Sequence, residues 1–229
     1  MTKAELLTTP IEHFDMTAHN VVPLVDAMRH MAFSARDLAR AADITARMVR
    51  DPECGVILCL AGSLVSAGLK KVFADAIRCN MVDAVVSTGA NVVDQDFFEA
   101  LGFRHHVGEE RLRSGMHDAD LRDLRIDRIY DTLIDEDELR ECDDVTRRNA
   151  DALDPRPYSS REFVVAMGAY LDRHGCKTPD SIVYEAYKAD VPVFCPAFSD
   201  CSAGFGLVAH HIRGDGPKVS IDSARTSTN

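Results

Sequence analysis

Short stretches of small and polar residues follow three apolar runs, and they hold the side chains best suited to bind a ligand. They are Gly62-Ser63, Thr88-Gly89-Ala90 and Ser199-Asp200, with Asp94 and Asp96 close behind the second. Small residues let backbone N–H groups approach a phosphate or a ribose, and a helix start adds a favourable dipole. The carboxylates suit ribose hydroxyls or a cationic substrate. The pattern predicts a nucleotide site; the alternative is a set of ordinary turns capped by Ser and Asp.

The fold must bring these turns together, and the apolar runs in front of them indicate how. Val56–Leu60, Val82–Val86 and Val191–Ala197 each precede one turn. The first is a continuous apolar run, as expected of a strand covered on both faces of a parallel sheet, and two prolines predict that the third is short. The carboxyl ends of parallel strands share one edge, where open α/β sheets bind ligands. We therefore expect an α/β fold, although the GxGxxG fingerprint and the Walker P-loop are both absent.

Periodic apolar residues and capping residues predict helices in much of the remaining chain. Two helices form an amino-terminal pair, starting after Asn20 and at Ser34, behind an irregular arm. The helix after Ser63 carries Lys70 and Lys71, which we place on its solvated side. Further predictions are a solvated excursion (111–125), a strand (126–134), a polar surface helix (136–152), a helix capped by Ser159 or Ser160, a short helix (181–188) and a last strand (218–222). We assign the arm and helical pair to residues 1–52 and the α/β part to 53–229, together forming one compact domain.

The composition is that of a soluble globular protein of 229 residues with a net charge of −11. Nucleic acid binding needs a basic footprint, so we expect no nucleic-acid partner. An acidic surface can attract a cationic substrate such as a polyamine, but solubility alone explains it equally well.

Several other classes are disfavoured by the pattern. The start, MTKAELLTTPIEHFD, lacks the apolar core of a signal peptide, and no run approaches the ~18 apolar residues of a membrane span. The seven cysteines are scattered without a CxxC or Cys/His quartet, and the HHxxEE run at residues 105–110 is not an established ligand spacing. We expect a reduced, cytoplasmic protein without a metal or a membrane partner.

Three segments carry a resemblance to a known family. LCLAGSLVSAGL, NMVDAVVSTGANVVDQDFFEALG and DVPVFCPAFSDCSAGFG resemble, in this order, the deoxyhypusine synthases and their bacterial homospermidine-synthase-like relatives. The resemblance covers about residues 10 to 222 and implies a Rossmann-like parallel sheet flanked by helices, assembled as a homotetramer. It also implies NAD as the cofactor and transfer of the aminobutyl group of spermidine to an amine. The acceptor is a lysine of a translation factor in one branch and a small diamine in the other.

The resemblance further implies roles for individual residues. The first NAD-contacting turn is matched by Gly62, Ser63, Leu64, Val65 and Ser66, the second by Thr88, Gly89 and Ala90, and a further NAD-contacting carboxylate by Asp200. The family's paired acids after the second turn correspond, across a one-residue difference in length, to Val93-Asp94 or to Asp94 and Asp96. We assign Asp94 and Asp96 to the cationic substrate.

Two departures from the family pattern affect the chemistry. Phe205 stands where the hypusine enzymes place an aspartate that holds the polyamine, and a phenyl ring offers an ammonium only a weaker cation–π contact. The family's imine-forming lysine and its substrate-binding histidine lie in a carboxyl-terminal segment that is not found here, so no catalytic residue is assigned. In the family, NAD takes hydride from spermidine, and this lysine then carries the aminobutyl group.

Two functions follow as hypotheses. The first is an NAD-dependent aminobutyltransferase of the deoxyhypusine or homospermidine synthase type, seen as an incomplete chain. The second is a non-catalytic family paralogue that assembles with an intact subunit and regulates it.

Overall fold

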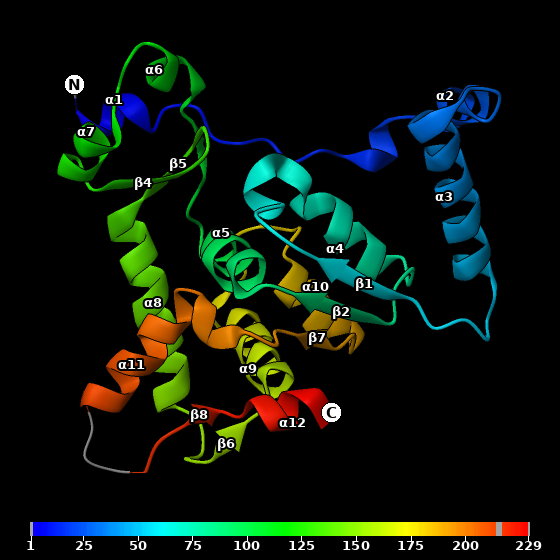
Figure 1. The fold of residues 1–229 in the computed structure, drawn as a ribbon. Helices are drawn as coiled ribbons and strands as arrows, with labels where there is room; N and C mark the ends of the chain where they lie inside the picture. Colours follow the sequence, from blue (N-terminus) through cyan, green and yellow to red (C-terminus); the bar gives the residue numbers. More distant parts are fainter. Residues whose placement is uncertain (1, 214–216, 229) are drawn as a thin grey trace.

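A parallel sheet formed by the three predicted strands lies at the centre of the chain (Figure 1). The structure is a computed structural model that describes residues 2–213 and 217–228. The strands are β1 (Ile57–Leu60), β2 (Ala84–Ser87) and β7 (Val193–Phe194), in the order β1-β2-β7. Leu58 pairs with Val85, and Val85 pairs in turn with Val193. The predicted α/β class with a parallel sheet is confirmed.

Helices cover only part of this sheet. Helix α10 (Ile182–Ala189) packs against α4 (Lys70–Arg78) and against α9 (Ser160–His174), and α9 also contacts β7. Successive side chains of a strand point to opposite faces, and in β1 Leu60 is buried whereas Ile57 is 62% exposed and Cys59 is exposed as well. The prediction that the first strand is covered on both faces is therefore wrong, because the described residues leave one face of β1 bare.

The helices that follow β1 and β2 begin with wide turns. Helix α4 is preceded by the π-helical segment η2 (Val65–Leu69), and α5 (Phe98–Ala100) by the π-helical segment η3 (Ala90–Phe97). Gly68, inside η2, has φ +90° and kinks the segment, and a Cβ there would lie 2.8 Å from the carbonyl oxygen of Glu12. π-Helical turns are rare and occur often at functional sites.

The amino-terminal region contains more structure than the predicted arm. Helix α1 (Lys3–Leu6) and the 3₁₀ turn η1 (Met16–Ala18) flank a strap, residues 9–14. The strap is held by hydrogen bonds from the N–H of Ile11 to the carbonyl of His105 (2.8 Å) and from the N–H of Phe14 to that of Gly68 (2.7 Å). The predicted helical pair follows as α2 (Val22–Met28) and α3 (Phe33–Arg50). Figure 1 shows this pair set apart from the sheet.

A small second sheet accounts for the segment after α5. It is antiparallel, in the order β3-β5-β4, with β3 (His106–Val107), β4 (Ile126–Ile129) and β5 (Thr132–Asp135). The strand predicted over residues 126–134 is thus a hairpin, whose turn holds Tyr130 at φ 53°. The predicted excursion contains the short helices α6 (Glu109–Arg113) and α7 (Asp118–Asp123).

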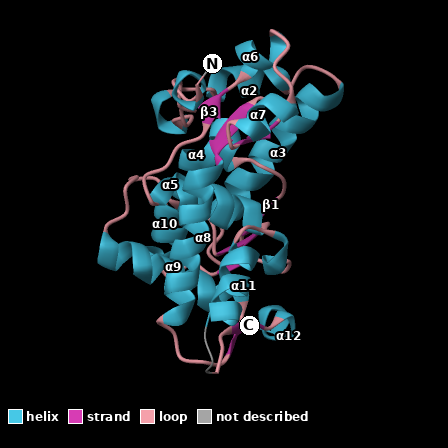
Figure 2. Cartoon of the chain, turned by 90° about the vertical axis from the view of Figure 1, so that its left-hand side faces the viewer, coloured by secondary structure: helices cyan, strands magenta, loops and turns pink. Residues whose placement is uncertain are grey.

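The helix after the second sheet packs beside the carboxyl-terminal helices, and together they share one core with the parallel sheet (Figure 2). Helix α8 (Glu136–Asp151) packs along α11 (Ala203–Arg213). The expectation of a polar surface helix is wrong for one side of α8, because this packing buries Cys142, Thr146 and Ala150. The remaining elements are β6 (Pro157–Tyr158), β8 (Ser220–Ile221), the turn η4 (Phe198–Asp200) and α12 (Ser223–Thr228). Among the described residues, no helix combines the length and apolarity that a bilayer crossing requires.

Candidate functional site

The three predicted turns meet at the carboxyl edge of the sheet and line one pocket of about 520 Å³. Ligand sites of open α/β sheets lie at this edge, and the volume is in the range of small-molecule sites. Six of the assigned residues line the pocket: Gly62, Ser63, Thr88, Gly89, Ala90 and Asp200. The fold therefore brings together residues that are up to 138 positions apart in the sequence, as the prediction requires.

The other three residues of the first turn lie behind the pocket. Val65 and Ser66 are 0% and 1% exposed, and neither they nor Leu64 line it. The Leu64 N–H donates to Oδ1 of Asn91 (2.9 Å), and the Ser66 N–H donates to Oε1 of Gln95 (2.8 Å). These two N–H groups are therefore used to hold η2 against η3 and are not offered to a ligand.

A third link joins α4 to α5, the helices that continue η2 and η3. Lys70 at the start of α4 forms an ion pair with Glu99 in α5, and both side chains are 1% exposed. Glu99 also accepts hydrogen bonds from His105 Nδ1 (2.7 Å) and from His13 Nε2 (2.6 Å). The prediction that Lys70 is solvated is wrong, because the carboxylate of Glu99 and the hydroxyl of Thr178 hold its ammonium group inside the protein.

The second turn must contain glycine. A Cβ on Gly89 would lie 2.4 Å from Sγ of Cys201 and 2.7 Å from its Cβ, so only glycine lets the turns after β2 and β7 approach this closely. Sequence reasoning treated Cys201 only as one of seven scattered cysteines. Its packing against Gly89 joins the turn after β2 to the turn after β7.

Asp200 is the one assigned carboxylate at the pocket. Its side chain is exposed, and it forms no hydrogen bond or ion pair with the side chains and backbone that the structure describes. Such a carboxylate can accept hydrogen bonds from two ribose hydroxyls. Small side chains in the other two turns leave room for a sugar-phosphate chain beside it, so these residues fit the ribose and phosphate parts of a dinucleotide.

Asp94 lies next to the pocket wall without lining it. Its Oδ1 accepts a hydrogen bond from the N–H of Ser202 (2.9 Å), directly before α11. Burial raises the pKa of Asp94 to about 7, and the nearby charge of Asp143 adds to the shift. Burial likewise raises the pKa of Asp143 to about 6. Sequence reasoning missed Asp143, because it sits among the many charged residues of a helix expected to be solvated.

Asp96 is not brought to the pocket. Its side chain is 0% exposed, and it accepts hydrogen bonds from the Ser181 hydroxyl and from the N–H groups of Ile182 and Val183, each 2.8 Å long. These groups form the amino terminus of α10, which Asp96 therefore caps. Burial raises its pKa to about 6 against the charge of Lys70 and these bonds. In this structure Asp96 has no exposed surface with which to contact a substrate.

The remaining sequence candidates for special chemistry are separated. Phe205 lies on α11 and is 71% exposed. Within residues 2–213 and 217–228, no group of three or more His, Cys, Asp or Glu side chains is arranged to hold a metal ion. The HHxxEE run is divided between the buried His105, bound to Glu99, and the exposed Glu109, paired with Arg113.

Comparisons with known proteins place the chain among relatives of one kind. A family model described as "Deoxyhypusine synthase" matches residues 23–228. The chain is 59% identical to a "Deoxyhypusine synthase-like protein" of Chlorobaculum parvum over 98% of its own length and 63% of the relative's. It is 52% identical to a protein of the same description from Coxiella burnetii, over 97% and 62% of the two chains. The chain thus spans somewhat less than two thirds of the length of these curated relatives.

One solved structure supports the fold. A crystal structure of a candidate deoxyhypusine synthase from Entamoeba histolytica superposes with a TM-score of 0.64 at 15% identity, covering 95% of this chain and 72% of the other.

Proposed function

The chain belongs to the deoxyhypusine synthase family, and on this premise we propose that it binds NAD in the pocket formed by the three turns. The observation that carries the proposal is the meeting of Gly62-Ser63, Thr88-Gly89-Ala90 and Asp200 at the carboxyl ends of parallel strands. Asp200 would bind ribose hydroxyls, and the backbone of the two small-residue turns would lie along the phosphates.

We further propose that the reaction is an aminobutyl transfer from spermidine or a related polyamine to an amine acceptor, either a small diamine or a lysine of a translation factor. NAD, when bound, supplies an acceptor for hydride. The chain's own contribution is to position the cofactor through the turns and to attract the cationic polyamine through its acidic surface. Asp94 follows the second turn by four residues in the sequence, and ionised it would favour an ammonium group nearby. A homotetramer and a cytoplasmic location stay predictions of the family resemblance.

The alternative is a non-catalytic family member that regulates an intact subunit. Lys70 does not supply a free amine in this structure, because its ammonium group is held by Glu99 and Thr178. The two functions differ in the product. Incubation with spermidine, NAD and putrescine should give homospermidine if the chain is an enzyme, and with the translation factor it should give a modified lysine. A stimulated rate only on mixing with a longer family member would favour the regulatory subunit.

NAD binding itself can be tested with two cysteines of the chain. Cys59 is exposed and lines the pocket, whereas Cys79 is exposed at the end of α4 and does not. We expect saturating NAD to slow alkylation of Cys59 about tenfold or more, as measured by peptide mass spectrometry, and to leave Cys79 unchanged. The Asp200→Asn variant should need a higher NAD concentration for the same protection. Equal alkylation of Cys59 with and without NAD would refute the proposed site.

A further inference from the structure

Residues 217–228 form a return segment that runs back from α11 to α9 and contains β8 and α12 (Figure 1). Of the side chains of residues 217–227, only those of Val219 and Thr226 are buried. Burial of apolar surface therefore contributes little to holding the segment, and segments with few buried apolar contacts open at low cost in free energy. Its position depends instead on individual hydrogen bonds.

His210 of α11 makes the central contact with the return segment. It is 6% exposed, its Nδ1 lies 2.6 Å from Oδ1 of Asp151 in α8, and its Nε2 accepts the N–H of Val219 (3.1 Å). An ionised carboxylate can only accept a hydrogen bond, and a backbone N–H can only donate one. These two partners together require a neutral imidazole that carries its proton on Nδ1.

The charged groups around this imidazole act in both directions. Burial alone raises the pKa of Asp151, but its hydrogen bond with His210 and the charge of Arg147 hold that pKa below its ordinary value, so the carboxylate is ionised. Asp151 attracts an imidazolium, whereas the ammonium group of Lys218, bonded to the carbonyl of His210 (3.1 Å), opposes one. The other charged or titratable groups on the two helices here are Asp144, Arg147, His211 and Arg213.

A second proton on His210 would break its contact with the return segment. This proton would sit on Nε2, so two N–H donors would face each other, and the N–H of Val219, a residue that is 1% exposed, would lose its acceptor. His211 differs, because its Nε2 lies 2.8 Å from the carbonyl oxygen of Val219 and a protonated imidazole still donates to a carbonyl. Histidine changes its charge between about pH 5 and pH 8. Mild acidification therefore acts on the contact of His210 and spares that of His211.

Two hydrogen bonds through Ser160, the first residue of α9, connect the return segment to the pocket. The N–H of Ser160 donates to Oγ1 of Thr226 (2.9 Å), and the hydroxyl of Ser160 accepts the N–H of Cys195 (2.9 Å). Ser160 is 0% exposed, and Cys195 directly precedes Pro196, which lines the pocket. Detachment of Thr226 would leave the buried N–H of Ser160 without its acceptor, next to the backbone that leads into the third turn.

We propose that the return segment is a pH-sensitive latch, docked while His210 is neutral and released when its imidazole gains a second proton. Release of the latch loosens the hydrogen bonds that hold Cys195, and with it the backbone at one side of the pocket. This inference does not depend on NAD binding or on the proposed reaction.

Two buried carboxyl groups near the start of α11 respond to acid with the opposite sign. Burial raises the pKa of Asp94 to about 7 and that of Asp143 to about 6. Because these values are raised in the folded state, protonation of the two groups favours folding as the pH falls. Acid-induced opening confined to the return segment therefore cannot come from these carboxyl groups.

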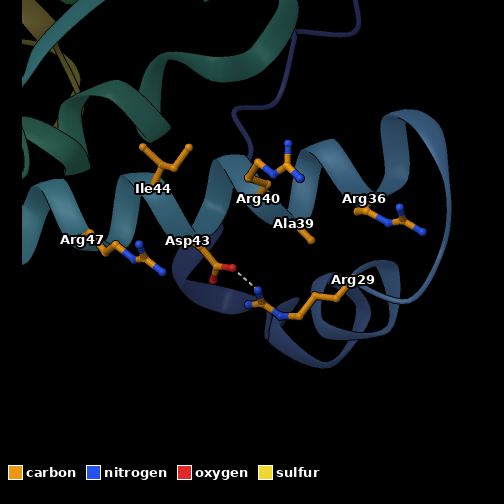
Figure 3. A pocket seen from close by; sticks show the side chains of 7 residues that line it. All are labelled: Arg29, Arg36, Ala39, Arg40, Asp43, Ile44 and Arg47. Carbon is orange, nitrogen blue, oxygen red and sulfur yellow. Dashed lines mark hydrogen bonds and ion pairs between the residues drawn. The ribbon is translucent and has the colours of Figure 1, made fainter.

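The test is hydrogen exchange of the full chain at about pH 8 and about pH 5.5, read by mass spectrometry and corrected for the intrinsic effect of pH on exchange. After this correction, we expect the amides of residues 218–228 and of Cys195 to exchange about tenfold or more faster at the lower pH. Helices α2 and α3 are the internal control. The cleft of about 490 Å³ between them is lined by four arginines, Asp43, Ala39 and Ile44, so its groups keep their charge across this pH range (Figure 3).

Two variants separate His210 from its neighbour. His210→Gln keeps an oxygen that can accept the N–H of Val219 but takes up no proton in this range, so exchange of the return segment should stay slow at both pH values. His211→Gln is the matched control and should keep the difference seen in the wild type. Absence of a pH effect on residues 218–228 of the wild type, which needs no variant, would overturn the proposal, as would an equal effect in His210→Gln. An equal acceleration in α2 and α3 would also overturn it, because acid would then loosen the whole chain.

Discussion

The buried ion pair between Lys70 and Glu99 gives the sharpest prediction about what holds the pocket in place. It joins α4 to α5, which follow the first and second turns of the pocket along the chain, and both side chains are 1% exposed. Burial alone raises the pKa of Glu99, but hydrogen bonds from His105 and His13 and the charge of Lys70 hold it well below its ordinary value. The folded state is thus built around an ionised carboxylate.

Removing one partner leaves the other charge buried without compensation. We expect Lys70→Met and Glu99→Gln each to lower the free energy of unfolding by about 3–5 kcal/mol, which for a chain of this size lowers the midpoint of thermal unfolding by roughly 6–20 °C. The double variant removes both charges, so it should be more stable than the sum of the single effects predicts, by about 2 kcal/mol or more. Lys71→Met is the matched control, because Lys71 pairs with Asp75 at 21% exposure of its own side chain and should cost less than about 1 kcal/mol.

The assay is urea unfolding followed by circular dichroism for the wild type and the four variants. Single-variant losses below about 1 kcal/mol, or strict additivity in the double variant, would refute the reasoning. The pH dependence provides a second check with a defined sign. Because the folded pKa of Glu99 is depressed, its contribution is present above its ordinary pKa of 4.5 and is lost as the pH falls below that value. Glu99→Gln should therefore remove part of the acid sensitivity of the protein.

Two further predictions concern the pocket wall. Burial raises the pKa of Asp94 to about 7, so the folded state keeps a proton that the unfolded state loses near pH 4. The free energy of unfolding should therefore fall, on the order of 3 kcal/mol, as the pH rises from about 4 to about 7. Urea unfolding of Asp94→Asn should show a flatter pH profile in this range, and an unchanged slope would contradict the prediction. Gly89→Ala should cost about 1–3 kcal/mol and weaken the protection of Cys59 by NAD, because its Cβ would meet Cys201 at 2.4 Å. The control Gly55→Ala has nothing within 4 Å of the new Cβ and should change stability by no more than about 0.5 kcal/mol.

The sequence was sufficient for the parts of the fold that depend on neighbouring residues. Apolar runs located β1, β2 and β7, and the rule that parallel strands end at one edge brought their turns together. Ser159 was correctly one of two predicted caps of α9, because capping is a local interaction between residues three positions apart.

The parts that sequence reasoning missed depend on distant partners. Lys70 is polar and was placed in solvent, but its carboxylate partner is 29 positions away and a second contact, Thr178, is 108 positions away. Asp96 was assigned to a substrate because carboxylates near a turn suit that role, whereas its hydrogen-bonding partners begin 85 positions later, at Ser181. Periodicity counts both residues as polar and contains no information on whether another segment supplies the opposite charge or the N–H groups.

The bare face of β1 was also missed because it depends on distant segments, and it lies next to the pocket. A continuous apolar run indicates that a strand can be buried on both faces, but not which segment buries it. In the described residues β1 is an edge strand, and the strand order β1-β2-β7 follows the chain order without the reversal at which doubly wound sheets open their ligand crevice. Such a reversal would lie beside β1, next to Gly62-Ser63 and the exposed Cys59. A segment that pairs with the free edge of β1 would therefore lie beside the pocket that the three turns line, and we expect it to change the accessibility of Cys59.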